Sequence, residues 1–223
     1  MVSRDLSPAF EDYLKTIWSA QEWTDETLTT TALATRMGFA ASTVSEAVRK
    51  LTEQGLVTHP KYGAIALTDS GRDAALAVVR RHRLLETFLV RQLGYGWDEV
   101  HDEAEVLEHA VSDTLVDRID AALGFPDRDP HGDPIPRPDG ALERLDAISL
   151  DLAPVGTPYV VARVADRSPE LLRYLEASAV LPQARVLVTA RNEAAGIVSV
   201  QVDGRSVELG LPAAGAIWVQ RAG

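Results

Sequence analysis

Residues 29–57 read "TTTALATRMGFAASTVSEAVRKLTEQGLV" and determine the fold of the N-terminal part of the chain. The first ten of these residues predict a short helix ended by Gly38, and a second helix is expected over about 42–54. Two short helices joined by a tight turn are the helix-turn-helix pattern. Residues 57–58 and 64–67 alternate like strands around a turn at "KYG". A hairpin after this motif predicts a winged helix.

Further helices are expected on both sides of this motif. Residues 7–21, "SPAFEDYLKTIWSAQ", place apolar side chains at i, i+3, i+4, i+7 and i+8, after a serine and a proline suited to a helix start. The later helices are expected over about 69–92, 97–112 and 113–123. Residues 124–140 contain five of the twelve prolines, so an extended connection is expected there.

The C-terminal part changes to a strand pattern with one helix that starts at Ser168 and Pro169. We expect a small five-stranded barrel with an inserted helix, and an α+β fold that is mainly α. The expected strands are 159–166, 185–191, 196–204, 205–210 and 216–221. The expected domains are a winged helix (1–73), a helical domain (74–140), a linker (141–157) and the small barrel (158–223).

Composition narrows the class of protein. The 223 residues include no cysteine, which excludes disulfides, cysteine–zinc sites and thiol catalysis. No apolar run approaches the roughly 20 residues of a membrane span, and no signal peptide pattern is present, so we expect a cytoplasmic protein. The net charge of −11 argues against nucleic acid as a partner. Even residues 1–73 hold seven basic and ten acidic side chains, so DNA binding requires the basic groups to gather on one face.

The second helix of the motif is the candidate recognition helix. Small hydroxyl side chains near its start suit close approach to bases or phosphates, and basic side chains farther along it and on the wing suit phosphate contacts. Glu46 has two open interpretations, a contact to a cytosine amine or a solvated carboxylate. Interaction modules that bind no DNA also use this geometry. The candidate DNA-binding residues are Ser42, Thr43, Ser45, Glu46, Arg49, Lys50 and Lys61.

A second signal is residues 101–109, "HDEAEVLEH". His101, Glu105, Glu108 and His109 fall within about a quarter-turn of one another on a helix. Neighbouring carboxylates without a lysine or arginine repel one another unless a cation lies between them, and imidazole and carboxylate suit a divalent metal ion. His82 and Glu86 lie upstream with the same i, i+4 spacing. The alternative is a solvated acidic face with incidental histidines.

Five ordered blocks now carry a resemblance: "EDYLKTIW", "STVSEAVRKLTEQGLV", "RRHRLLETFL", "VHDEAEVLEH" and "HGDPIP". Over essentially the whole chain, the sequence resembles the diphtheria-toxin-repressor family of metal-activated transcriptional repressors, which has iron and manganese branches. The resemblance implies that residues 1–73 bind DNA, that residues 74–140 form a metal-binding and dimerisation domain, and that the barrel of residues 158–223 is SH3-like (FeoA-like). It also implies two metal sites per subunit. The primary site would consist of Asp12, Glu105, Glu108 and His109. The ancillary site would consist of His82, Glu86 and His101, with Asp166 and Glu170 as further ligands from the SH3-like domain.

Two differences from the iron-type members of the family indicate which metal ion this chain binds. Iron-type members have methionine at the position of Asp12 and cysteine at that of Glu105, and replacing sulfur with oxygen favours Mn²⁺. Small manganese-type members often have glutamate where this chain has Lys15, which cannot bridge two ions. We therefore expect two separated Mn²⁺ sites, in a manganese-type member that keeps its SH3-like domain. An Fe²⁺-dependent repressor is the alternative.

The resemblance implies a homodimer that binds palindromic operator DNA when metal-loaded and controls metal-homeostasis genes. Metal would tie the first helix to the helix of Glu105 and His109 and so fix two recognition helices at a spacing of roughly 34 Å. A di-metal carboxylate enzyme is a remote alternative, but "EVLEH" lacks the Glu-x-x-His spacing of such bundles. "DPIPRP" would also suit an intramolecular contact with the SH3-like domain.

Overall fold

The computed structural model describes residues 6–23, 27–60, 63–166 and 168–222. The chain divides into two compact units, one formed by residues 1–81 and 136–141 and the other by residues 82–135 and 142–223. The boundary falls inside one long helix, α4 (Asp69–Phe88). None of the described helices is long and apolar enough to cross a membrane.

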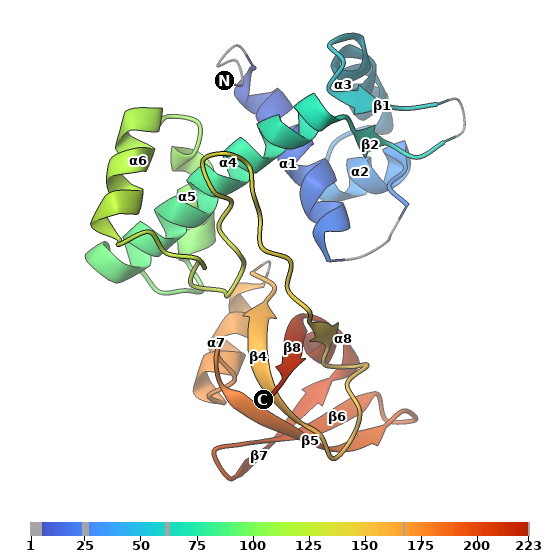
Figure 1. The fold of residues 1–223 in the computed structure, drawn as a ribbon. Helices are drawn as coiled ribbons and strands as arrows, with labels where there is room; N and C mark the ends of the chain where they lie inside the picture. The colour runs from blue at the N-terminus through green and yellow to red at the C-terminus, as the bar shows by residue number, and fades with distance from the viewer. Residues whose placement is uncertain (1–5, 24–26, 61–62, 167, 223) are drawn as a thin grey trace. The chain divides into compact units, whose positions relative to one another are not determined.

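The first unit contains the predicted winged helix (Figure 1). Its elements are α1 (Pro8–Glu22), α2 (Thr30–Met37), α3 (Ala41–Glu53) and the antiparallel pair β1 (Val57–Thr58) and β2 (Ala66–Leu67). The Thr29 hydroxyl caps α2 by accepting a hydrogen bond from the Ala32 amide, and Gly38 ends α2 at a φ of 68°. The core of this unit includes Leu14, Ile17, Leu33, Val44 and Leu51, all fully buried.

The start of α4 is fitted closely to the end of the winged helix. The Thr68 hydroxyl accepts from the Gly71 amide and donates to the carbonyl of Gly55. A Cβ at Gly71 would lie 1.8 Å from the Leu56 carbonyl oxygen, so only glycine permits this approach. The first turn of α4 is therefore fixed against the end of the winged helix.

The second unit begins with the remainder of α4 and continues through η1 (Leu89–Leu93), α5 (Val100–Leu107) and α6 (Asp113–Ala122). The helical prediction was approximate here. The expected helix over about 69–92 ends as one π-helical turn, η1. The helix expected over about 97–112 ends at Leu107, because the chain must turn before Ser112 caps α6. The helical core consists of Leu84, Leu85, Ala104, Val116, Ile119 and Ile135.

The second unit also contains a six-stranded antiparallel sheet, which we call the β domain (Figure 1). Five strands were predicted, and the sixth, β3, was missed because its two residues show no alternation. The short helix α8 (Leu211–Gly215) was also missed, whereas α7 (Pro169–Ala177) was expected. The strand order is β3 (Ile148–Ser149), β8 (Ile217–Arg221), β4 (Pro158–Val164), β5 (Arg185–Asn192), β6 (Ile197–Val202) and β7 (Arg205–Gly210).

Candidate metal centre

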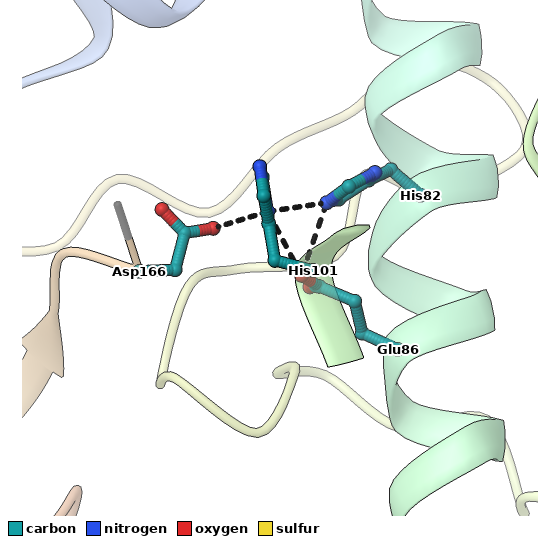
Figure 2. Close-up of side chains that lie close together, drawn as sticks. All are labelled: His82, Glu86, His101 and Asp166. Carbon is teal, nitrogen blue, oxygen red and sulfur yellow. Dashed lines mark hydrogen bonds and ion pairs between the residues drawn. The ribbon is translucent and has the colours of Figure 1, made fainter. Parts of the chain in front are cut away.

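Four side chains of the second unit converge in what we call the central cluster (Figure 2). His82 and Glu86 lie on α4, where the i, i+4 spacing places them on one face. His101 lies on α5, and Asp166 follows the end of β4. One ligand atom from each of these residues lies within 4.8 Å of the others.

The contacts in the central cluster join nitrogen and oxygen atoms only. His82 Nε2 lies 3.0 Å from Glu86 Oε1 and 3.2 Å from His101 Nδ1. The same His101 nitrogen lies 3.4 Å from Glu86 Oε1 and 3.2 Å from Asp166 Oδ2. Two imidazoles and two carboxylates at such distances form a donor set suited to a divalent transition metal.

Burial and charge explain the protonation of the central cluster without metal. Burial raises the pKa of Glu86, but His82, His101 and His131 outweigh it and hold that pKa well below the usual range. Burial lowers the pKa of His101, but Asp166 and Glu86 raise it to about 11. Burial also opposes the charge of Asp166, and His101 nevertheless lowers its pKa. Protonated imidazole therefore balances the buried carboxylates, a role that a metal cation would take over.

A neighbouring group that sequence reasoning missed is formed by Glu86, Asp129 and His131, all buried. His131 Nε2 lies 2.6 Å from the carbonyl oxygen of Trp97, which can only accept, so this nitrogen carries the proton. Burial lowers the pKa of His131, but Glu86 and Asp129 raise it to about 10, so without metal Nδ1 also carries a proton; this atom lies 3.8 Å from Glu86 Oε2. Neither of these two buried atoms has a hydrogen-bond partner. A metal ion that displaced the Nδ1 proton would be a natural partner for both atoms, and the hydrogen bond from His131 Nε2 to the Trp97 carbonyl already orients the ring.

The signal for this group was present in the sequence. His131 belongs to the "HGDPIP" block, but it lies in a proline-rich loop and not on a helix with periodic ligands. Asp129 Oδ1 accepts hydrogen bonds from the backbone amides of His131 and Asp133, both at 2.9 Å, and thereby folds the loop. Burial raises the pKa of Asp129 to about 8, with Asp133 and Glu86 adding to the effect.

Three of the four predicted primary ligands lie in the second unit. Glu108 is fully buried; its Oε2 lies 2.6 Å from His82 Nδ1 and its Oε1 lies 3.5 Å from His109 Nε2. Glu105 Oε1 lies 3.5 Å from His101 Nε2. His82 thus has one ring nitrogen facing Glu86 and the other facing Glu108, and it links the two predicted sites.

The two remaining predicted ligands belong to other elements. The fourth primary ligand, Asp12, lies half-buried on α1 of the first unit. Glu170 is exposed in the first turn of α7 and belongs to none of the metal-capable groups among the described residues.

The candidate recognition helix is α3. Ser42, Thr43 and Ser45 are exposed on it, and so are the charged candidates. Arg49 pairs with Glu46 through two contacts, at 2.6 and 2.9 Å, and also with Glu53. Lys50 lies 3.6 Å from Glu46. The predicted wing residue Lys61 lies outside the described residues.

The proline-rich segment lies mainly against α4. Arg83 Nη1 donates to the Pro134 carbonyl at 2.7 Å, Arg80 Nη1 donates to the Pro136 carbonyl at 2.8 Å, and Ile135 packs in the helical core. The β domain is contacted by residues 131–133, which overlap the predicted segment 133–138 only at Asp133. The Val164 amide donates to the His131 carbonyl at 2.9 Å, and Arg163 Nε lies 2.7 Å from Asp133 Oδ1.

A winged helix joined to a histidine–carboxylate centre defines a class of metal-responsive DNA-binding protein. Family models match the whole architecture. They are "Iron dependent repressor, N-terminal DNA binding domain" over residues 5–65, "Iron dependent repressor, metal binding and dimerisation domain" over residues 68–137, and "FeoA domain" over residues 148–221.

Individual proteins agree with these models. The iron-dependent repressor IdeR of Mycobacterium leprae is 32% identical over 90% of this chain and 91% of its own length. The diphtheria toxin repressor of Corynebacterium diphtheriae is 34% identical over 78% of this chain and 74% of its own. The solved structure of a manganese-dependent transcriptional repressor in complex with manganese is 57% identical, with a TM-score of 0.92, over 96% of this chain and 100% of that one.

The chain belongs to the diphtheria toxin repressor (IdeR) family, and it is a metal-dependent transcriptional repressor with a C-terminal FeoA domain. The predicted family and fold class are therefore confirmed. The family consists of transcriptional repressors, which excludes the alternative of a di-metal enzyme.

Proposed function

We propose that this protein is a Mn²⁺-activated repressor that binds palindromic operator DNA as a homodimer and controls metal-homeostasis genes. The observation that carries the proposal is the buried donor set around Glu86. Its carboxylate faces His82, His101 and His131, and all the donor atoms are nitrogen or oxygen. The chain contains no cysteine to supply thiolate, so the centre suits Mn²⁺ better than softer ions.

We propose two metal sites per subunit. The ancillary site would use the central cluster, with His131 and Asp129 as additional donors on the far side of Glu86. The primary site would use Asp12, Glu105, Glu108 and His109, an assignment that comes from the family pattern. Glu170 has no role in this proposal because its side chain is exposed and outside the donor groups.

When bound, Mn²⁺ would supply the positive charge that protonated histidines supply in its absence. Glu105, Glu108 and His109 are anchored within the second unit, through His82 and α5. Asp12 belongs to α1, which packs in the same unit as α3. Joining Asp12 to the other three ligands would therefore restrict the recognition helix relative to the dimerisation helices. A conformation that binds metal more tightly becomes more populated when metal is present.

The homodimer would use the exposed apolar side chains of the dimerisation domain. Val106 is 72% exposed and Phe125 is 69% exposed, and Leu93 and Leu115 are also largely exposed. The exposure of these four large apolar side chains within one helical domain supports an interaction surface there. A dimer would present two α3 helices to successive major grooves about 34 Å apart.

For DNA contact, Ser42, Thr43 and Ser45 would approach the operator most closely, because they are small and exposed on α3. Arg49 and Lys50 would exchange their contacts with Glu46 for phosphates, together with Lys61 of the wing.

The test is operator binding followed by fluorescence anisotropy at fixed salt, using the protein's own promoter region. Mn²⁺ and, under anaerobic conditions, Fe²⁺ are titrated separately against a chelator blank. We expect Mn²⁺ to raise affinity at free concentrations where Fe²⁺ acts poorly. An equal or stronger response to Fe²⁺ would instead support an Fe²⁺-dependent repressor, the activity that the name of the 32%-identical relative describes. Operator binding that is unaffected by either metal would refute the metal-dependent switch.

A further inference from the structure

The loop after α6 is fitted to the β domain by a glycine. The Val164 amide of β4 donates to the His131 carbonyl at 2.9 Å. The next residue, Gly132, has a φ of 91°, and a Cβ there would lie 2.2 Å from the carbonyl oxygen of Ala162. Ala162 lies in a bulge of β4, where the register with β8 shifts between Val161 and Arg163. Any larger side chain at position 132 would separate the loop from the strand.

A buried ion pair lies directly beside this contact. Arg163 Nε, from β4, lies 2.7 Å from Asp133 Oδ1, and both side chains are about 5% exposed. The Arg163 guanidinium also lies 4.4 Å from the centre of the Trp218 ring on β8. Arg163 is therefore held from both sides within the interface of the loop and the β domain.

The same carboxylate is also approached from the helical part of the unit. Arg83 of α4 lies 3.6 Å from Asp133 Oδ1 and 3.5 Å from Asp129 Oδ2. α4 also provides His82 and Glu86 of the central cluster. Asp133 thus lies between an arginine of the metal-binding helix and an arginine of the β domain. Removing one member of such a set leaves the other buried charges uncompensated.

The contact between Gly132 and β4 lies close in sequence to two donors of the metal centre. Asp166 follows Val164 by two residues, and it reaches His101 at 3.2 Å. On the loop side, His131 immediately precedes Gly132 and faces Glu86. The close packing of this loop on β4 therefore fixes the positions of two donors, Asp166 after the strand and His131 in the loop.

We propose that Gly132, Asp133 and Arg163 form a permanent junction that positions Asp166 at the central cluster, whether or not metal is bound. These three are positioning residues and not ligands. The β domain is then a constant part of the sensor, and metal binding does not recruit it. The role of Asp166 as a ligand rests on the proposed function, but the junction itself does not.

The first test is amide hydrogen exchange of the full-length protein in excess chelator, read at Val164. In the wild-type protein we expect this amide to be protected without metal, and protection to change little when Mn²⁺ is added. An amide that exchanges freely in chelator and becomes protected only with Mn²⁺ would overturn the proposal. This measurement needs no variant, and its result does not depend on whether the protein represses transcription.

The second test compares Arg163→Gln and Asp133→Asn with a matched control, Arg191→Gln. Arg191 donates to the Ala153 carbonyl at 2.7 Å within the β domain, away from the junction. We expect the junction variants to exchange the Val164 amide about tenfold faster in chelator, while the control matches the wild type. Mn²⁺ affinity at the ancillary site should fall about 10- to 100-fold, as for other ligand-positioning contacts, with the primary site unchanged. Arg163→Lys should restore part of the loss. Junction variants that match Arg191→Gln in both readouts would refute the role.

Discussion

The charged groups on α3 and those of the central cluster are of similar kind but differ in their access to water. On α3, Arg49 pairs with Glu46 and Glu53, and all three side chains are exposed to solvent. In the central cluster, Glu86 is fully buried and depends on histidines for compensation. Exposed ion pairs contribute little and exchange partners readily, whereas buried charges need a fixed counter-charge. The first arrangement suits contact with a polyanion, and the second suits selective capture of a cation.

The largest effect is expected from Glu86→Gln, which removes the charge at the centre of the buried set. His82, His101 and His131 would then lose the buried carboxylate that they share, and the free energy of unfolding should fall by about 3 kcal/mol without metal. Mn²⁺ affinity at this site should fall by about 100-fold or more. Calorimetric titration and Mn²⁺ electron paramagnetic resonance measure the binding, and denaturant unfolding measures the stability.

The control for this variant is Asp102→Asn, because Asp102 is exposed on α5 beside His101. It should bind Mn²⁺ like the wild type. If Glu86→Gln also retains wild-type affinity, the central cluster is not a metal site.

A smaller effect is expected from the double substitution Asp12→Met and Glu105→Cys, which brings sulfur to the proposed primary site. The ratio of Fe²⁺ to Mn²⁺ affinity should rise about tenfold, because sulfur ligands favour the softer ion. Metal-dependent anisotropy under anaerobic conditions measures the ratio, and Asp102→Cys controls for the presence of a thiol. An unchanged ratio would show that these two positions do not determine selectivity.

Mn²⁺ binding to the central cluster should depend on pH through His101. The pKa of His101 is raised to about 11 by Asp166 and Glu86 against the effect of burial, above the 6.5 of an ordinary histidine. Its stabilising contribution without metal is therefore complete below pH 6.5 and is lost as pH rises through 11. Metal must displace this proton, so Mn²⁺ affinity should increase several-fold per pH unit between about 7 and 9.

Calorimetry in buffers of different ionisation enthalpy measures the proton release. His101→Gln should release about one proton fewer on binding Mn²⁺. Equal release by the variant and the wild type would show that His101 is not protonated in the metal-free protein.

The smallest effect is expected from Glu46→Gln on α3. Releasing Arg49 and Lys50 from this carboxylate should raise operator affinity only about two- to threefold, because the ion pairs are exposed. Anisotropy with the Mn²⁺-loaded protein measures the change. A loss of affinity confined to operators with one particular base pair would instead show that Glu46 reads a base.

The winged helix and most helix positions were predictable from sequence because local signals determine them. Gly38, the Thr29 cap and the period of apolar residues in α1 act within a few residues. The donors on α4 and α5 were found for the same reason, since i, i+4 spacing is a local property. The early end of α5 was not predicted, because it depends on the chain turning toward α6.

The contribution of the loop to the site could not be read from spacing. His131 becomes a candidate ligand only because Trp97 fixes its ring and Glu86 faces its other nitrogen, and these residues are distant in sequence. The pairing of Asp133 with Arg163 likewise depends on the close approach allowed by Gly132. Asp166 was named from the family pattern, and the structure brings it into the central cluster. Glu170 was named in the same way but is exposed.

The most direct test of the central claim is anomalous diffraction from crystals of the Mn²⁺-loaded protein, recorded at the manganese absorption edge. We expect two peaks per subunit. One should be bound by Glu86 and its neighbours in the central cluster, and the other by Glu105, Glu108 and His109 together with Asp12. The absence of a peak at Glu86 under saturating Mn²⁺, with the surrounding histidines still paired to carboxylates, would contradict the assignment of the buried cluster as a metal centre.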